Sequence, residues 1–539
     1  MEIMKLRNIV VACALLGAMM LSSCYGFLEE DPKTQQVMDQ FWRTREDGIA
    51  GLHAVYIAGV RNLLNADLGT GWTPTVPMYT GLMSGLFLDR RHDRDFTSHA
   101  ERGNFTLLTM TGAAGQIWNQ LYVGVNRASL AIEQIPRMTG IFSPDEINNM
   151  VAQAKFFRAL NFFELVKNFG DIPVFEVPFT NPAETFMPRS PAIEAYQLIE
   201  RDLLAAIPAL PNTTFYQNGG RVTRAMAQTL LARVYLQWAG FPMNGGNEMY
   251  AKAAAMAQQV ITGGSGHALI HSAGTTTGLN SAFNLIREAK AGTPGAVEVI
   301  YAAEFNLALG FTQSWFRRAV PTAMTNLPHI ASTNAYSGFV PTPMLMESFH
   351  PDDIRGMNQQ FFFTYLYTSV GDRFELGEVG NWFWFDYNAL RTNVGSSQNI
   401  PLMRFAEVLL IAAEGLARTG NEAAAKGYLN QVRTRAGLPA NTDSGNDLIQ
   451  AILTERLHEF PLEFLIWDDI RRTRLYPQAS TVPGRLNWVS LSTAVIQNKP
   501  APGINTVGLL PEWVLLWPIP LPQMSANPAF EGQQNPGWE

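Results

Sequence analysis

Apolar residues in the middle of the chain recur with the spacing of an amphipathic helix, most clearly between Ala152 and Val166. Steps of three and four residues place these side chains on one face. The segment 143–146 (Ser-Pro-Asp-Glu) precedes the stripe and has the sequence of a capping box with proline at the first helical position. Gly170 and Pro173 follow the stripe and block its continuation. The pattern predicts a long helix that starts near residue 144 and ends near residue 168.

Similar periodicity predicts more helices, at about 116–135, 191–207, 225–238, 250–261, 405–418 and 422–436. The last four form two pairs, each joined by a turn that is rich in glycine or asparagine. In the second pair, Gly420 suits a left-handed C-terminal position and Asn421 can cap the next helix. Alanine is abundant in both pairs and permits close helix approach. Such pairs are typical of tetratricopeptide repeats, which have a period of about 34 residues. The spacing here is irregular, so degenerate repeats and a generic helical bundle both fit the pattern.

Between the helical blocks the composition changes to glycine, threonine, asparagine and aromatic residues. Short β-like runs occur there at 297–305, 361–367 and 382–387. We expect a single domain over 24–539, in which a helical scaffold (about 40–262 and 401–475) carries loop-rich insertions (about 65–112 and 263–400). A Pro-rich segment without helical periodicity (about 476–539) completes this domain. Loops of that length are usually functional or disordered, and their many aromatic residues argue against disorder.

The start of the chain has the pattern of a bacterial lipoprotein signal. Lys5 and Arg7 give a positive region, and residues 9–21 form an apolar stretch that is too short to span a bilayer. Small residues precede Cys24, so residues 1–23 are predicted to be a signal peptide and Cys24 the lipidated residue. An ordinary secretory signal with an incidental cysteine is the alternative.

Composition narrows the possible chemistry. The chain has two cysteines, and only Cys24 would remain after processing, which excludes a disulfide or a cysteine-based metal site. Loss of residues 1–23 takes the formal charge from -7 to -8. A mildly acidic chain without a basic run is a poor candidate for binding nucleic acid or an anionic lipid surface. No later segment reads as a membrane span.

No catalytic motif or cofactor fingerprint is recognisable. The eight histidines show no metal-ligand spacing, and His92 and His99 fit a solvated turn better than a metal site. Adjacent carboxylates such as Asp352 and Asp353 say little, because glycosidase pairs are defined by their separation across a cleft. Nucleophile-elbow, P-loop and dinucleotide-binding patterns are absent from the sequence. We therefore predict a protein that is not an enzyme and that needs no cofactor or metal.

Several segments, taken in order, resemble the SusD/RagB-like outer-membrane lipoproteins of Bacteroidetes. The segments that carry the resemblance are 24–29 (CYGFLE), 117–128 (IWNQLYVGVNRA), 152–173 (AQAKFFRALNFFELVKNFGDIP), 221–236 (RVTRAMAQTLLARVYL), 353–355 (DIR), 404–414 (RFAEVLLIAAE), and 517–520 (WPIP) with 527–528 (NP) and 534–538 (QNPGW). Each is weak alone, but together they run along nearly the whole chain.

One segment departs from the family pattern. Residues 455–472 align with a stretch that usually contains Glu-Gly-x-Arg. Glu463 is kept here, whereas Phe464 and Ile466 stand where glycine and arginine are usual. We expect loss of that arginine to repack a structural ion-pair network. Because of this departure, the resemblance supports an inference about the fold better than one about the substrate.

The resemblance implies a mostly α-helical SusD-like fold, with degenerate tetratricopeptide-like helix pairs, long irregular loops and short strands. It also implies lipid anchoring to the outer membrane with exposure to the cell exterior. The implied partner is a TonB-dependent, SusC-like β-barrel transporter. The implied function is capture of a nutrient, an oligosaccharide or in some branches a peptide, and its delivery to that transporter. The acidic run 29–31 resembles the surface-export signal of such lipoproteins.

A sugar-binding site would use exposed aromatic rings, which stack on the apolar faces of sugars. We predict Trp72, Tyr79, Trp315 and Tyr336 as ligand-binding residues, because they lie in the loop-rich insertions. The alternative for each is a core or partner-contact aromatic. The run 382–385 (WFWF) is discounted as a core strand before the next helix. Two rival functions stay open: a lipid-anchored glycoside hydrolase and a pure protein-binding scaffold.

Overall fold

A computed structural model describes residues 41–64, 76–88, 107–179, 186–272, 278–327, 337–367, 371–392, 395–463, 465–498 and 506–538. Cys24, Trp72, Tyr336 and Phe464 lie outside these ranges. No helix in the described part of the chain is long and apolar enough to cross a membrane.

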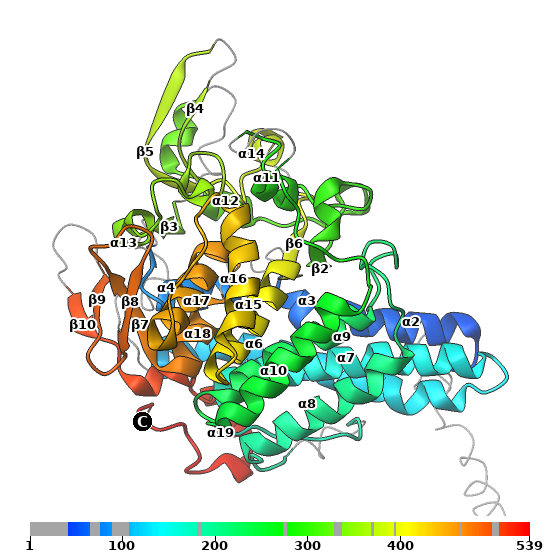
Figure 1. Ribbon diagram of the computed structural model, residues 1–539. Helices are drawn as coiled ribbons and strands as arrows, with labels where there is room; N and C mark the ends of the chain where they lie inside the picture. The colour runs from blue at the N-terminus through cyan, green and yellow to red at the C-terminus, as the bar shows by residue number, and fades with distance from the viewer. Residues whose placement is uncertain are drawn as a thin grey trace, which may run out of the picture.

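Long helices pack side by side into the body of the molecule (Figure 1). The helices of at least eight residues are α2 (Arg45–Tyr56), α4 (Val76–Met83), α6 (Leu107–Gln134), α7 (Pro144–Phe169), α8 (Ala192–Ala206), α9 (Arg224–Ala239), α10 (Gly246–Thr262), α15 (Phe405–Arg418), α16 (Glu422–Arg435), α17 (Gly445–Glu459) and α18 (Ile466–Thr473). From α6 to α10 each long helix packs on the next, and α10 then packs on α15. The predicted mostly helical fold is confirmed.

Helix α7 starts and ends where its sequence predicts. The Ser143 hydroxyl accepts a hydrogen bond from the Glu146 amide, and the Glu146 carboxylate accepts one from the Ser143 amide. This reciprocal capping box satisfies two otherwise unpaired donors. Gly170 ends the helix with φ of 71°, a region that favours glycine. Local chemistry therefore determines both ends of the longest predicted helix.

The two predicted helix pairs are α9–α10 and α15–α16. Asn421 caps α16 by accepting a hydrogen bond from the Ala424 amide, as its place after Gly420 predicts. The pairs also pack against each other, because α10 lies on α15. A Cβ atom at Gly415 would lie 2.5 Å from the Tyr250 carbonyl oxygen, so the glycine permits this close approach.

Short helices and hairpins fill the insertions and the C-terminal segment. The short helices are α3 (Val60–Leu63), α11 (Ala282–Arg287), α12 (Trp315–Ala319), α13 (Pro343–Glu347), α14 (Tyr387–Thr392) and α19 (Leu521–Ala526). The strands form five antiparallel pairs: β1 (Phe87–Leu88) with β3 (Val340–Pro341), β2 (Val299–Ala303) with β6 (Ile400–Arg404), β4 (Phe362–Tyr367) with β5 (Arg373–Asn381), β7 (Leu475–Ala479) with β8 (Leu486–Ser490), and β9 (Val495–Asn498) with β10 (Thr506–Leu509).

Two strand predictions, 297–305 and 361–367, correspond to β2 and β4. The third, 382–387, is wrong, because residues 382–385 form a turn before α14. All four rings of this run are nevertheless buried, as expected of core residues. The β-like sequence reflects burial of large apolar rings rather than strand pairing.

Two hydrophobic cores support the structure. The larger core runs through the helices. A smaller, separate core consists of Phe316, Val320, Met324, Phe363, Leu376, Trp382, Phe385, Ala389 and Leu390. The insertion between β2 and β6 thus has a core of its own, which holds the β4–β5 hairpin outside the helical body (Figure 1).

The C-terminal segment closes over the end of α7. The Asn535 side chain donates hydrogen bonds to the carbonyl oxygens of Phe169 and Trp517, at 2.9 and 2.7 Å. The Trp517 amide donates to the Asn168 carbonyl oxygen at 2.6 Å. These contacts give a structural role to two of the motifs that carried the family resemblance.

Candidate functional site

Residues from both loop-rich insertions line one partly open cavity of about 100 Å³. Leu64 and Thr80, which lie on either side of the stretch that contains Trp72, line one part of its wall. Trp315 and Trp384, from the second insertion, line another part. The predicted ligand-side insertions are therefore neighbours in space around this cavity.

Helices α7 and α18 supply a charged wall to the same cavity. The Lys167 ammonium lies 2.8 Å from a carboxylate oxygen of Asp468 and 2.8 Å from one of Glu164. Burial alone would lower the pKa of Lys167, but the two carboxylates more than offset it and raise the pKa above its ordinary value. Nearby, Arg233 forms a two-bond ion pair with Glu407 at 2.5 and 2.7 Å. The wall is polar but largely self-neutralised.

Size decides what this cavity can hold. Small-molecule sites usually occupy about 300–1,000 Å³. A volume of about 100 Å³ has room for only a few waters, since one water takes about 30 Å³ in the liquid. The cavity is too small for an oligosaccharide, so it is not itself the ligand site.

Trp315 has only 1% of its surface exposed, and its ring packs against Trp384 with centroids 5.2 Å apart. A ring in this position cannot stack on a sugar at the surface. The prediction of an exposed stacking ring at residue 315 is corrected: Trp315 is a core residue that lines the cavity wall. Composition indicated an aromatic loop but could not show which way this ring points.

Trp72, Tyr79 and Tyr336 are the other predicted ligand-binding residues. Trp72 and Tyr336 lie outside the residues that the structure describes. Tyr79 belongs to α4, but its side chain is not among the described ones. These three stay predictions. The sequence analysis did not predict Tyr365 and Tyr367 of the β4–β5 hairpin as surface aromatic residues. Two tyrosines separated by one residue in a predicted strand could have indicated that both rings lie on one face.

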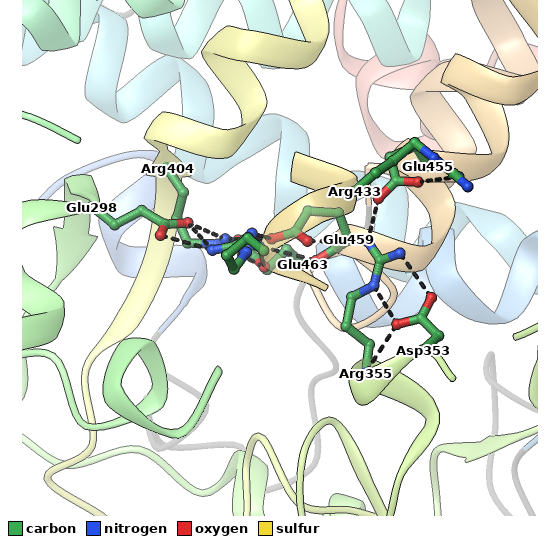
Figure 2. Close-up of polar contacts among 9 residues, drawn as sticks. Glu298, Asp353, Arg355, Arg404, Arg433, Glu455, Glu459 and Glu463 are labelled. Atoms are coloured by element: carbon green, nitrogen blue, oxygen red, sulfur yellow. Dashed lines mark hydrogen bonds and ion pairs between the residues drawn. The ribbon is translucent and has the colours of Figure 1, made fainter. Parts of the chain in front are cut away.

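A buried cluster of arginines and carboxylates fixes the second insertion to the helices (Figure 2). The cluster, named here the arginine network, consists of Arg355, Arg404, Arg433, Arg435, Glu298, Asp353, Glu455, Glu459 and Glu463. Arg404, at the end of β6, lies at its centre. It donates to Glu298 at 2.6 Å, to Glu459 at 2.8 Å and to both carboxylate oxygens of Glu463.

Two of the family-like motifs meet in this network. Asp353 and Arg355 form a two-bond ion pair at 2.8 and 2.9 Å. Arg355 also donates to Glu455 of α17 at 2.7 Å. The Asp-x-Arg element thus ties its loop to the helical scaffold, and its role is structural.

The network has four arginines and five carboxyl groups, which leaves one carboxyl without a full charge partner. Burial raises the pKa of Glu463 to about 7, although the Arg404 guanidinium acts in the opposite direction. In contrast, the arginines around Glu459 outweigh its burial and lower its pKa to about 2. Glu463 is therefore the member that takes up a proton near neutral pH.

The divergent segment 455–472 supplies a second ionic cluster. Arg472 donates two hydrogen bonds to Glu414 of α15, at 2.6 and 2.7 Å, and also pairs with Asp469. Ile466, at the position where the family usually has arginine, is 2% exposed in the main core. The segment thus keeps the ion pairs of Arg472, whereas position 466 holds a buried apolar side chain. Whether the missing arginine repacked the network stays a prediction.

His458 lies beside the arginine network and is fully enclosed. Its Nε2 lies 2.8 Å from the Ser348 hydroxyl, and its ring stacks on Phe349 at 4.4 Å. Burial, reinforced by the charges of Arg355 and Arg433, lowers the pKa of His458 to about 3. The folded protein therefore holds this imidazole neutral over the whole physiological range.

This burial predicts acid sensitivity. The unfolded chain binds a proton at His458 below about pH 6.5 and the folded chain does not, so stability falls as the pH drops from about 6.5 towards 3. We expect wild type to lose about 2 kcal/mol more than His458→Gln between pH 7 and pH 5. Urea unfolding at both pH values measures this difference. Equal losses for the two proteins would contradict the buried neutral imidazole.

Among the described residues, no three histidine, cysteine, aspartate or glutamate side chains gather as a metal-ligand set. Glu164 and Asp468 are a close carboxylate pair beside the cavity, and the Lys167 ammonium lies between them. Both carboxylates are therefore paired with the same cation, whereas the carboxyl groups of a glycosidase flank a scissile bond. This pair therefore provides no glycosidase geometry.

Comparison with known proteins identifies similar sequences and folds. A model of the SusD family matches residues 378–538, and a model described as "Starch-binding associating with outer membrane" matches residues 94–236. SusD-like protein P2 of Formosa agariphila is 27% identical over 500 residues, which cover 87% of this chain and 90% of that protein.

Solved structures show the same fold. A SusD superfamily protein from Parabacteroides distasonis aligns with a TM-score of 0.75 at 24% identity, covering 90% of this chain and 98% of the other. A laminarin-binding SusD-like protein aligns with a TM-score of 0.66 at 20% identity, covering 92% and 99%.

Proposed function

Since this chain is a SusD-like protein of the SusD/RagB family, we propose that it is a cell-surface lipoprotein that captures an oligosaccharide and passes it to a transporter. The observation that carries the proposal is the SusD-like helical scaffold together with aromatic-rich insertions, both of which contribute residues to one part of the molecule. A relative of this fold is described as binding laminarin, which supports a glycan as the ligand class.

Binding, rather than catalysis, is the chemistry that the described residues favour. The buried carboxylates are held in ion pairs with arginine or lysine, and these pairs join helices and loops. A general acid needs a carboxyl whose raised pKa is combined with access to a substrate. In the arginine network Glu463 has the raised pKa, but Arg404 covers its carboxylate and 7% of its side chain is exposed. Burial also raises the pKa of the exposed Glu304, and a turnover assay of the purified protein tests that residue.

The proposed partner is a TonB-dependent, SusC-like β-barrel transporter in the outer membrane. Cys24 is proposed to carry the lipid that holds the protein at that membrane, facing the cell exterior. Anchoring would keep the binding surface close to the transporter mouth, where a weak binder still delivers its ligand because its effective concentration is high.

The experiment that tests the proposal is a glycan and peptide binding screen with the purified chain from residue 25 onward. We expect one glycan class to bind and Trp72→Ala to weaken it on the order of tenfold, because one aromatic contact contributes about 1 kcal/mol or more. Phe186→Ala is the control, since this ring is 55% exposed on the segment before α8. Calorimetric titration of the three proteins measures the change.

Each rival function has its own outcome in the same screen. Binding of peptides and no glycan would make the chain a peptide-capturing member. Turnover of a bound glycan by the purified protein would make it a glycoside hydrolase. Association with the transporter without any ligand would leave a protein-binding scaffold.

A further inference from the structure

The β4–β5 hairpin has one buried and one open face. Its register pairs Tyr365 with Glu375, Leu366 with Phe374, and Tyr367 with Arg373. Leu366 and Phe374 pack against the smaller core. Because side chains alternate between faces, the tyrosines, Arg373 and Glu375 share the opposite face.

This open face carries two aromatic rings and an ion pair. Tyr367 is 64% exposed, and its ring meets Tyr365 edge to face with centroids 5.7 Å apart. The Arg373 guanidinium lies 3.7 Å from the centroid of the Tyr365 ring, and its Nε is 2.5 Å from a Glu375 carboxylate oxygen. Stacking and pairing together hold the guanidinium in one orientation.

A contribution to folding stability does not explain why these residues stand on the open face. An exposed ion pair contributes little to stability, and the hairpin is already held by the packed face behind it. Large exposed rings beside oriented polar groups are instead typical of a binding surface. The hairpin projects from the molecule, away from the long helices (Figure 1).

The chemistry of the face favours a neutral sugar. A pyranose ring presents apolar C–H groups, which stack on an aromatic ring such as Tyr367. Sugar hydroxyls both donate and accept hydrogen bonds, and the Arg373–Glu375 pair supplies a donor and an acceptor side by side. A uronate or sulfate group would gain from Arg373 but would meet the negative charge of Glu375.

We propose that the open face of the β4–β5 hairpin, formed by Tyr365, Tyr367, Arg373 and Glu375, is a second glycan-binding subsite that takes a neutral polysaccharide. It rests on the proposed glycan-binding function and is separate from Trp72 and its insertion. A glycan long enough to contact both sites gains avidity, because its second contact is intramolecular, whereas a short one does not.

The test is native affinity electrophoresis of the purified chain in gels that contain laminarin, pullulan, xylan or alginate. We expect one of the three neutral polysaccharides to retard wild type more than alginate does. Tyr367→Ala and Arg373→Ala should reduce that retardation, with an increase in apparent Kd on the order of tenfold for the polymer. Tyr367→Phe keeps the ring and should bind like wild type. Tyr387→Ala, at a 47% exposed tyrosine on α14, is the matched control.

Each other outcome overturns the subsite. Unchanged retardation of Tyr367→Ala and Arg373→Ala, with binding lost in Trp72→Ala, would reject the subsite and leave the proposed function intact. Failure of wild type to bind any of the three neutral polymers would also reject it. Loss of transporter association in Tyr367→Ala, with unchanged gel mobility, would make the face a protein contact. Circular dichroism of each variant should match wild type, because the substituted side chains face solvent.

Discussion

Arg404→Ala is expected to lower the free energy of unfolding by about 3–5 kcal/mol, or to prevent folding altogether. Arg404 is completely buried and pairs with Glu298, Glu459 and Glu463. Removing the guanidinium takes away the arginine that pairs with Glu463, while Glu298 keeps Arg435 and Glu459 keeps Arg435 and Arg355. A desolvated charge without its partner is the costly case. The midpoint of urea unfolding, with the yield of soluble protein, measures the effect.

An exposed ion pair provides the control for this prediction. Arg137 is 63% exposed and pairs with Glu133 one helical turn away. Arg137→Ala should change the free energy of unfolding by less than about 0.5 kcal/mol, because such pairs are weak in water. A loss below about 1 kcal/mol for Arg404→Ala would contradict the account of the arginine network.

Helices were predictable here because their signals are local. The bounds 405–418 agree with α15, and the capping box at Ser143 marks the start of α7. Periodicity and caps act within one or two turns, so one sequence contains all the required information. The C-terminal hairpins β7–β8 and β9–β10 were not predicted. Their strands of four or five residues provide too short a pattern.

The sequence motifs contain some members of the arginine network but not the others. The motifs at 353–355 and 404–414 contain several members, and Glu463 was noted as retained. Glu298 and Arg435 come from segments with no comparable signal, yet Glu298 pairs with Arg404 and Arg435 pairs with Glu298 and Glu459. Ion pairs between residues 100 or more positions apart depend on tertiary packing, which no local pattern encodes.

The candidate site likewise has features that the sequence predicts and features that depend on tertiary packing. Sequence identified two aromatic-rich insertions, and the structure brings their ends together at one cavity. It could not separate Trp315, which faces inwards, from Tyr367, which faces solvent. Both rings lie in glycine- and threonine-rich stretches, and only the packing around each one determines its orientation. Composition therefore located the region of the site but not its rings.

Cys24→Ser is expected to move the protein from the membrane fraction to the soluble fraction in a Bacteroidetes host. If Cys24 carries acyl chains, each buried methylene contributes about 0.8 kcal/mol, and two or more chains give stable anchoring. No helix in the described residues could span a membrane in its place. Fractionation followed by immunoblotting measures the change.

Cys13→Ser is the matched control, because Cys13 is the one other cysteine and lies within the predicted signal peptide. It should leave the protein at the membrane. Retention of Cys24→Ser at the membrane would contradict lipid anchoring. The anchored and released forms should bind a free glycan equally well, since the proposed role of Cys24 is attachment and not contact with the ligand. Growth on that glycan should still fall for Cys24→Ser, because delivery depends on the concentration of the binder at the transporter and not on its affinity alone.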